Sequence, residues 1–222
     1  MVQTEKTDTQ SGKITSQKYR HEMARKFLHM CSFLIVIFIY LTEKTAACIV
    51  IGALFLILFI GNTILLSSGF RFLNEFKVKY FSFLLRDDEK YGYISSNWFL
   101  LGCFLSVFLF QKEIAMLAIT ILIFGDAFAA LIGMKFGKHK FKNGKSWEGT
   151  LGFIGVSYLL LAGFYFALSL TLSFALAALI VIPITAVSEV YSKHLKIDDN
   201  LLIPLIFGVL MTGLLYAAGF VF

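Results

Sequence analysis

The chain has 222 residues, of which 58% are hydrophobic and 15% charged, and its formal net charge is +6. This hydropathy is far above what a soluble domain of this size needs to fill one core, so the composition excludes a soluble globular protein. We expect an integral, multi-pass membrane protein, and because the alternating pattern of a transmembrane barrel is absent, its fold class is an all-α helix bundle. The three cysteines lie in apolar runs without metal-ligand spacing, and no disulfide is expected.

Residues 1–24 are polar and are expected to form a cytosolic tail, followed by a single transmembrane domain over residues 25–222. The tail has no cleavable apolar core, so no signal peptide is predicted. The missing targeting sequence favours the plasma membrane of a prokaryote over an organelle membrane. His29 follows Arg25 and Lys26 by one helical turn, which indicates either a snorkelling interfacial cluster or a contact to phosphate.

Uncharged stretches predict about seven transmembrane helices, because about 20 residues at a rise of 1.5 Å cross a hydrocarbon core of about 30 Å. Residues 149–188 form a run of 40 uncharged residues, which is enough for two passes with a turn near residues 169–173. The other passes are expected at residues 27–41, 46–66, 94–110, 114–134 and 201–222.

The placement of lysine and arginine predicts the orientation, because cytoplasmic loops hold the excess of positive charge. Eighteen of the 20 lie in residues 1–26, 67–97, 135–148 and 191–199. We therefore expect the N-terminus and the loops 67–97 and 135–148 in the cytosol, and the C-terminus outside. Within the first loop, residues 71–86 carry aromatic residues at helical spacing and predict an amphipathic helix at the inner membrane surface, either a linker or a gate for lipid.

Asp126 lies two-thirds of the way along an apolar segment, where a carboxylate costs several kcal/mol unless it meets water, a cation or a polar partner. Ala130, Gly133 and Gly137 follow it on one face of the same helix. A face of such small residues predicts close packing against a neighbouring helix or the close approach of a nucleotide.

The loop 137–146, GKHKFKNGKS, is not a Walker A motif, because the pattern GxxxxGK[ST] requires a glycine where His139 stands. Its glycines, with Lys145 as a point charge and Ser146 as a hydroxyl, are nevertheless suitable for cradling phosphates. The remaining lysines of the loop are explained by the positive-inside bias alone.

Acidic residues from separate segments are expected to meet at the inner side of the bundle. Carboxylates that repel one another are most simply held together by a divalent cation, and Mg²⁺ takes carboxylate oxygens. We therefore predict a magnesium site formed by Asp126, Glu148, Glu189 and Asp199. For Glu148 the helix macrodipole offers a simpler explanation, since it opens a helix directly after the loop.

Four segments resemble one known family: RKFLHM, GDAFAALIGMKFGK, NGKSWEGTLGF and SEVYSKHLKIDDNLLIP. The chain is similar to the CTP-dependent lipid-alcohol kinases, which include dolichol kinase, phytol and farnesol kinase and the yeast-type diacylglycerol kinase. The likeness covers most of residues 25–207. It implies transfer of the γ-phosphate of CTP to a membrane alcohol at the cytosolic face, with Mg²⁺ as cofactor.

Carried over by position, the resemblance implies Asp126, Lys145 and Glu148 as catalytic residues. The nucleotide contacts that it implies are Gly133, Gly137, Lys145, Ser146, Gly149, Thr150, Asn200 and His29. The expected partners are CTP or another nucleoside triphosphate, the bilayer, and a prenol or polyprenol such as phytol, farnesol, geranylgeraniol or a dolichol-type alcohol. No nucleic-acid partner is expected.

Three alternative functions stay open on the sequence. The acceptor could be a diacylglycerol. The CDP-diacylglycerol synthases share the motif pattern, although their C-terminal signature is missing from residues 185–222. A small transporter could use Asp126 as its coupling carboxylate, but transporters carry such charges in both halves of the membrane.

Overall fold

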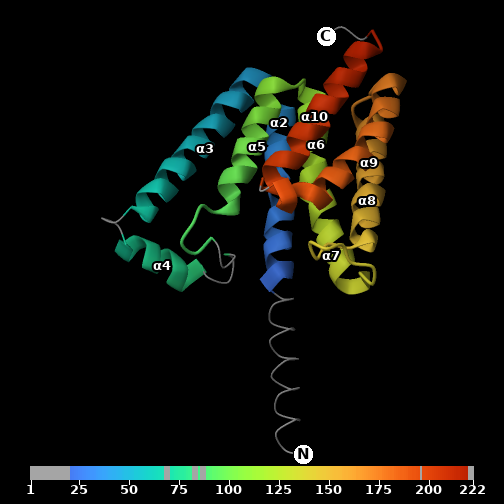
Figure 1. Cartoon of the computed structure of the whole chain (residues 1–222). Helices are drawn as coiled ribbons and strands as arrows, with labels where there is room; N and C mark the ends of the chain where they lie inside the picture. The colour runs from blue at the N-terminus through green and yellow to red at the C-terminus, as the bar shows by residue number, and fades with distance from the viewer. Residues whose placement is uncertain (1–20, 68–70, 82–84, 86–88, 196, 220–222) are drawn as a thin grey trace, which may run out of the picture.

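The structure, a computed structural model shown in Figure 1, describes residues 21–67, 71–81, 85, 89–195 and 197–219. Most of the predicted cytosolic tail, residues 1–20, lies outside the described residues. The described part is helical and contains no strand; its one β-type contact is an isolated bridge between Lys140 and Ser146. An N-terminal helix (residues 21–31) is followed by α2 Leu34–Leu41, α3 Lys44–Leu66, α4 Arg71–Phe81, α5 Ser95–Leu109, α6 Lys112–Thr120, the π-helix η2 Ile121–Gly125, α7 Asp126–Phe136, α8 Trp147–Ala167, α9 Leu172–Leu195 and α10 Asp199–Ala217.

The fold class is confirmed as an all-α bundle of a multi-pass membrane protein. Within the described residues, six helices or continuous helix pairs are long and apolar enough to cross a bilayer. The seventh expected pass is α5, which has 15 residues and is therefore about 22 Å long. The turn expected near residues 169–173 separates α8 from α9, and Ser169 adopts a positive φ of 50° there.

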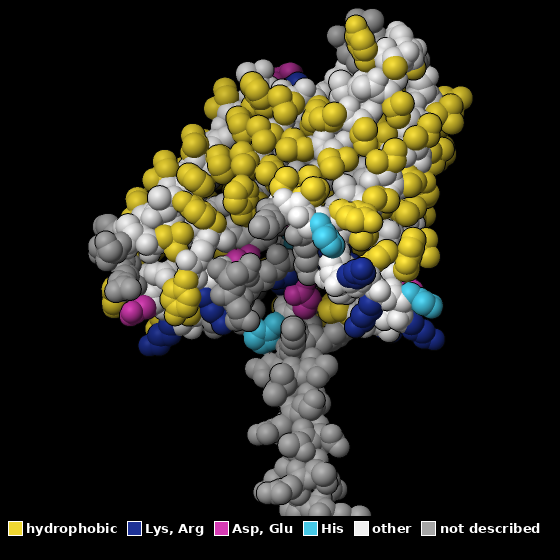
Figure 2. All heavy atoms as spheres, viewed as in Figure 1, with side chains coloured by type: hydrophobic (Ala, Val, Ile, Leu, Met, Phe, Trp, Pro, Cys, Tyr) yellow, Lys and Arg dark blue, Asp and Glu magenta, His cyan; other side chains and the backbone are white. Residues whose placement is uncertain are grey.

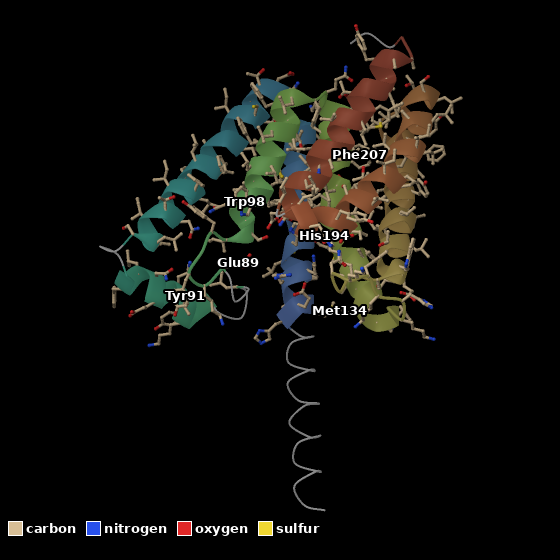
Figure 3. The ribbon with its side chains drawn as sticks, in the orientation of Figure 1. Glu89, Tyr91, Trp98, Met134, His194 and Phe207 are labelled. Carbon is tan, nitrogen blue, oxygen red and sulfur yellow. The ribbon has the colours of Figure 1, made fainter. Side chains whose placement is uncertain are left out.

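The centre of the bundle is the continuous segment α6–η2–α7. In the most apolar 18-residue stretch of this segment 78% of the residues are buried inside the protein, compared with 17% in that of α3. It contacts α2, α5, α8 and α10, which surround it, while α3 packs against α5 at one side of the bundle (Figure 1). Phe207 of α10, labelled in Figure 3, is fully buried in this core. Asp126 thus belongs to the best-protected helix of the molecule.

Two of the spanning segments are interrupted near the same level. The first is broken between the N-terminal helix and α2, where Ser32 and Phe33 form two consecutive three-residue turns with N–H to carbonyl distances of 3.0 and 3.1 Å. The second is widened to a π-helix over Ile121–Gly125, directly before Asp126. Single π-turns inside α-helices occur frequently at functional sites, and non-helical backbone at membrane depth is tolerated where it lines a cavity.

The amphipathic helix expected over residues 71–86 is α4, Arg71–Phe81; residues 82–84 and 86–88 lie outside the described part. Its aromatic side chains Phe72, Phe76 and Tyr80 are exposed. Its polar side chains Asn74 and Lys77 are buried, and both donate at 3.4 Å to carbonyls of the segment before α5. Burial lowers the pKa of Lys77, an effect that the nearby Glu89 opposes. The aromatic face is thus left free to lie on a membrane surface.

Charged side chains gather at one end of the bundle. Figure 2 shows lysine, arginine, aspartate, glutamate and histidine side chains around the lower end of the molecule, while hydrophobic side chains cover most of the visible flank. This distribution agrees with a bundle embedded in lipid that keeps its polar site near one membrane boundary.

Candidate active site

Three carboxylates meet where α7, α9 and α10 converge. One oxygen each from Asp126, Glu189 and Asp199 lies within 4.8 Å of the others. Asp126 and Glu189 are 7% and 4% exposed, so water can screen their mutual repulsion only weakly. The structure therefore brings together three of the four residues that we predicted as magnesium ligands. The donor set fits Mg²⁺, which takes oxygen ligands and is commonly held by one or two carboxylates plus phosphate oxygens.

Two lysines neutralise most of this charge. Lys26 of the N-terminal helix forms an ion pair with Asp126, and its side chain is 7% exposed. Lys145 forms an ion pair with Glu189, donates to the Glu189 carbonyl at 2.6 Å, and lies 3.7 Å from Asp199. With all five groups ionised the cluster keeps one formal negative charge. A divalent cation or a phosphate group would redistribute these pairs.

The loop 137–146 is joined to α8 by Ser146. Ser146 is the N-cap residue of α8 and its Oγ accepts a hydrogen bond from Gly149 N–H at 3.1 Å. Gly133 and Gly149 allow α7 and α8 to touch: a Cβ at Gly149 would lie 2.7 Å from the Ala129 carbonyl oxygen. The small-residue face predicted after Asp126 therefore does pack against a neighbouring helix, and the same glycines line a cavity beside it.

Glu148 lies apart from the three-carboxylate cluster. Its Oε1 is 2.8 Å from Nδ1 of His139, and the His139 backbone N–H donates to both carboxylate oxygens at 3.2 and 3.3 Å. The first helical turn of α8 directs this side chain toward the loop. The structure does not place Glu148 beside Asp126. Its metal-binding and catalytic roles therefore stay predictions.

Two cavities open on the cluster from different sides. We call the first the loop cavity; its volume is about 610 Å³. Its wall includes Gly133, Gly137, Lys145, Ser146, Gly149 and Thr150, together with Met134 at the lower end of α7 (Figure 3). All of these except Met134 were predicted as nucleotide contacts.

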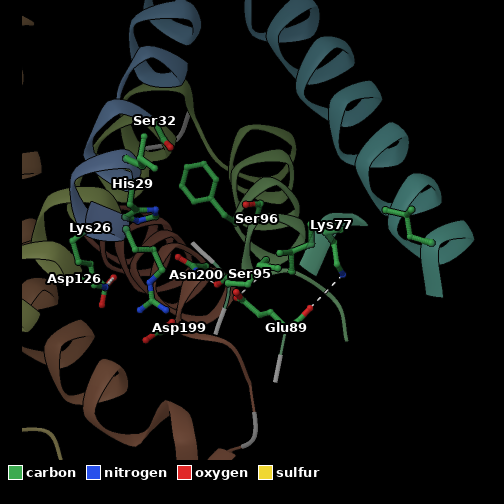
Figure 4. Close-up of a pocket in the computed structure, with 16 residues that line it drawn as sticks. Lys26, His29, Ser32, Lys77, Glu89, Ser95, Ser96, Asp126, Asp199 and Asn200 are labelled. Carbon is green, nitrogen blue, oxygen red and sulfur yellow. Dashed lines mark hydrogen bonds and ion pairs between the residues drawn. The ribbon is translucent and has the colours of Figure 1, made fainter. Parts of the chain in front are cut away.

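We call the second the α5 cavity; its volume is about 470 Å³. It lies between the N-terminal helix, the end of α3, α5 and the start of α10 (Figure 4). In Figure 4, Lys26 and Asp126 lie at one side of this cavity and Lys77 and Glu89 at the other. The two cavities share Lys26, Asp126 and Asp199, which form their common wall.

Two of the predicted nucleotide contacts line the α5 cavity and are absent from the wall of the loop cavity. His29 packs edge-on against Phe99, with ring centroids 5.0 Å apart. Asn200 donates from its side-chain amide to Ser95 Oγ and to Asp198 Oδ1, both at 2.8 Å. The structure thus splits the predicted contacts between two chambers.

Sequence reasoning missed the part played by Lys26. Its position at the mouth of an apolar segment predicted a snorkelling side chain with its ammonium in water. In the structure the side chain instead points inward to Asp126. The signal that could have identified it is the spacing of Lys26 and His29, which places both on one helix face.

No protein-family profile and no solved structure matches the chain. An uncharacterized protein of Rickettsia prowazekii is 31% identical over 196 residues, which cover 86% of this chain and 93% of that protein. The CTP-dependent diacylglycerol kinase 1 of Saccharomyces cerevisiae is 29% identical over 66% of this chain. The phytol kinase of Synechocystis sp. is 33% identical over 51% of it. The matches span about half the length of each kinase, 51% and 48%.

Proposed function

Because the chain belongs to the same family as the Rickettsia prowazekii protein and is distantly related to two lipid kinases, we propose that it transfers the γ-phosphate of CTP to a membrane lipid alcohol. The proposed acceptor is a prenol or polyprenol, which the similarity to phytol kinase supports. The alternative acceptor is a diacylglycerol, which the similarity to CTP-dependent diacylglycerol kinase supports. The proposed site faces the cytosol, as the distribution of lysine and arginine predicts.

The observation that carries this proposal is the common wall of the two cavities. A transferase must hold two substrates with their reacting atoms about 3–3.5 Å apart. Lys26, Asp126 and Asp199 border both cavities, so ligands in the two chambers would meet at these side chains. A lipid alcohol can supply its hydroxyl there while its chain remains in the bilayer.

The loop cavity suits a triphosphate. Its glycines leave space beside the α7 and α8 backbones, and Lys145 offers a positive charge that can turn from Glu189 to a phosphate oxygen. Ser146 can donate its hydroxyl proton to a phosphate while it accepts from Gly149. Asp126, Glu189 and Asp199 would hold Mg²⁺. Glu148, which was also predicted as a ligand, contacts His139 instead. When bound, the ion supplies positive charge to the phosphate oxygens.

The transfer itself needs little covalent participation from the protein. The acceptor oxygen forms a bond to the γ-phosphorus, the bond from that phosphorus to the β–γ bridging oxygen breaks, and the nucleoside diphosphate leaves. The hydroxyl proton passes to a carboxylate of the common wall, Asp126 or Asp199. Lys26 and Lys145 stabilise the charge that spreads over the phosphoryl oxygens in the transition state.

The direct test uses the purified protein in lipid nanodiscs with each γ-labelled nucleoside triphosphate. Phytol, farnesol, a long polyprenol and a diacylglycerol are offered separately as acceptors. We expect CTP to label at least one alcohol in a Mg²⁺-dependent reaction. Absence of lipid label with every pair would contradict the proposal, and transfer of the α-phosphate with release of pyrophosphate would identify a cytidylyltransferase instead.

Replacing Lys145 by alanine is expected to raise the KM for the nucleotide or to lower kcat/KM by about 10- to 100-fold. A hydrogen bond from a charged group is worth about 1.5–3 kcal/mol, and this one would be made to a phosphate. Initial rates at varied nucleotide concentration measure the effect. Lys138→Ala, an exposed lysine of the same loop, is the matched control and should behave as wild type. Unchanged kinetics for Lys145→Ala would contradict a phosphate-binding role of the loop.

A further inference from the structure

We propose that the α5 cavity is the acceptor chamber and that His29 Nε2 forms a hydrogen bond with the hydroxyl of the lipid alcohol. This inference rests on the proposed kinase function and assigns the second substrate to a place. It also reassigns His29, which the sequence alone indicated as a nucleotide contact.

The division of residues between the cavities supports this assignment. The loop cavity already contains Lys145, Ser146 and the glycines beside them, which are the groups suited to phosphates. Among the described residues, the lining of the α5 cavity contains no glycine; its cations are Arg25, Lys26 and Lys77, and it reaches the same Asp126 and Asp199. A second chamber that touches the reacting centre without the glycine-lined loop is the place that we assign to the other substrate.

His29 lines this chamber and carries a polar atom without a hydrogen-bond partner in the described part of the chain. Its Nε2 is buried and has no hydrogen-bond partner among the residues that the structure describes. A buried polar atom without a partner costs free energy, and a ligand hydroxyl can remove this cost because it can both donate and accept. The ring packs edge-on against Phe99 in the cavity wall, at an interplanar angle of 70°, and a small rotation of the ring would bring Nε2 to a hydroxyl in the chamber.

The position of His29 would place such a hydroxyl near the phosphoryl group. His29 follows Lys26 by three residues on the N-terminal helix, so both side chains leave the same helix face. Lys26 contacts Asp126, and Asn200 in the same chamber is the chain neighbour of Asp199. A hydroxyl bound to His29 is therefore directed at the common wall (Figure 4).

The chamber also has a wall for an apolar chain. Leu28, Leu65 and Phe99 line it, and Leu28 is 48% exposed. A residue that both lines the cavity and is exposed marks its rim, here between the N-terminal helix and the end of α3. A lipid chain can leave the chamber over this rim into the bilayer, whereas a nucleotide base would gain nothing from it.

Two substitutions of His29 test the hydrogen bond. His29→Phe keeps an aromatic ring against Phe99 but removes the polar atom, and His29→Gln keeps an amide near the position of Nε2. We expect His29→Phe to lower kcat/KM for the alcohol at least tenfold while the Kd for CTP, measured without acceptor, stays within twofold. His29→Gln should recover at least half of the loss in log kcat/KM for the alcohol that His29→Phe causes. His194→Phe, at an exposed histidine of α9, is the matched control and should equal wild type.

A crosslinking experiment separates this inference from the proposed function. A geranylgeraniol and a diacylglycerol that carry a photoreactive diazirine in the chain are bound to the full-length protein in nanodiscs, and the modified residues are mapped by mass spectrometry. We expect modification at the rim of the α5 cavity, competed by the parent alcohol and reduced in His29→Phe. If this crosslinking pattern is found but no phosphoryl transfer is detected, the kinase proposal is refuted and the assignment of the α5 cavity as the lipid-binding chamber is supported.

Three results would overturn the chamber assignment. The first is phosphoryl transfer in which His29→Phe keeps the wild-type kcat/KM for every alcohol. The second is a rise of more than tenfold in the Kd for CTP in His29→Phe, which would place the nucleotide base in the α5 cavity. The third is crosslinking confined to other surfaces of the bundle.

Discussion

Asp126→Asn is expected to abolish phosphoryl transfer, leaving less than about a tenth of the wild-type kcat/KM, while the protein remains inserted and folded. The amide has nearly the shape of the carboxylate but carries no charge. It would weaken the predicted magnesium site and remove the ion pair with Lys26 at the common wall of the two cavities. Each tenfold loss corresponds to about 1.4 kcal/mol of activation free energy. Initial rates with CTP and a lipid alcohol, together with gel filtration in detergent, measure the two parts of this expectation.

Glu113→Gln is the matched control for this substitution. Glu113 lies on the same apolar segment as Asp126, but in the first turn of α6 at the other end of the span. It should keep wild-type activity. Retention of more than about a tenth of the activity by Asp126→Asn would remove Asp126 from the metal site.

Lys26→Met is expected to destabilise the protein strongly, by about 3–5 kcal/mol, because it leaves the buried Asp126 carboxylate without its partner. The double variant Lys26→Met, Asp126→Asn removes both charges and should recover most of the lost stability. It should remain inactive, since the reacting centre lacks its carboxylate. Thermal unfolding in detergent and the transfer assay separate these two effects.

Lys135→Met controls for the loss of a lysine near the same boundary, because Lys135 is exposed on α7. We expect its unfolding temperature to match wild type. Equal destabilisation in the single Lys26 variant and the double variant would show that the two side chains are not coupled. In that case the ion pair would not organise the site.

The helices could be predicted because lipid imposes a simple rule on sequence. Uncharged stretches must be helical, and about 20 residues must cross the core. The turn at Ser169 was predicted from run length alone, and α4 from the spacing of Phe72, Phe76 and Tyr80. The break at Ser32 and Phe33 could not be predicted in this way, because it lies inside the uncharged run 27–41 and no proline or glycine marks it.

The site could be predicted in part, for a similar reason. Asp126 is costly inside a span, and the topology puts Glu189 and Asp199 at the same inner side, so their convergence was expected. Glu148 lies in the first turn of α8 and contacts His139. This contact is local, so the cost of charge inside a membrane does not predict it. His29 lies on one side of the carboxylate cluster because of the way the N-terminal helix packs. The periodicity of apolar residues does not determine this packing.

The π-helix before Asp126 marks the place of one extra residue in the central span. A π-turn closes with one more residue than an α-turn, so losing one residue within Ile121–Gly125 could restore a regular helix of almost the same length, with Asp126 still directed at Glu189 and Asp199. A residue lost from the regular helix of α6 would instead turn Asp126 by about 100° relative to the rest of the span. Related sequences are therefore expected to tolerate a gap of one residue within this stretch, but not in the regular helix before it.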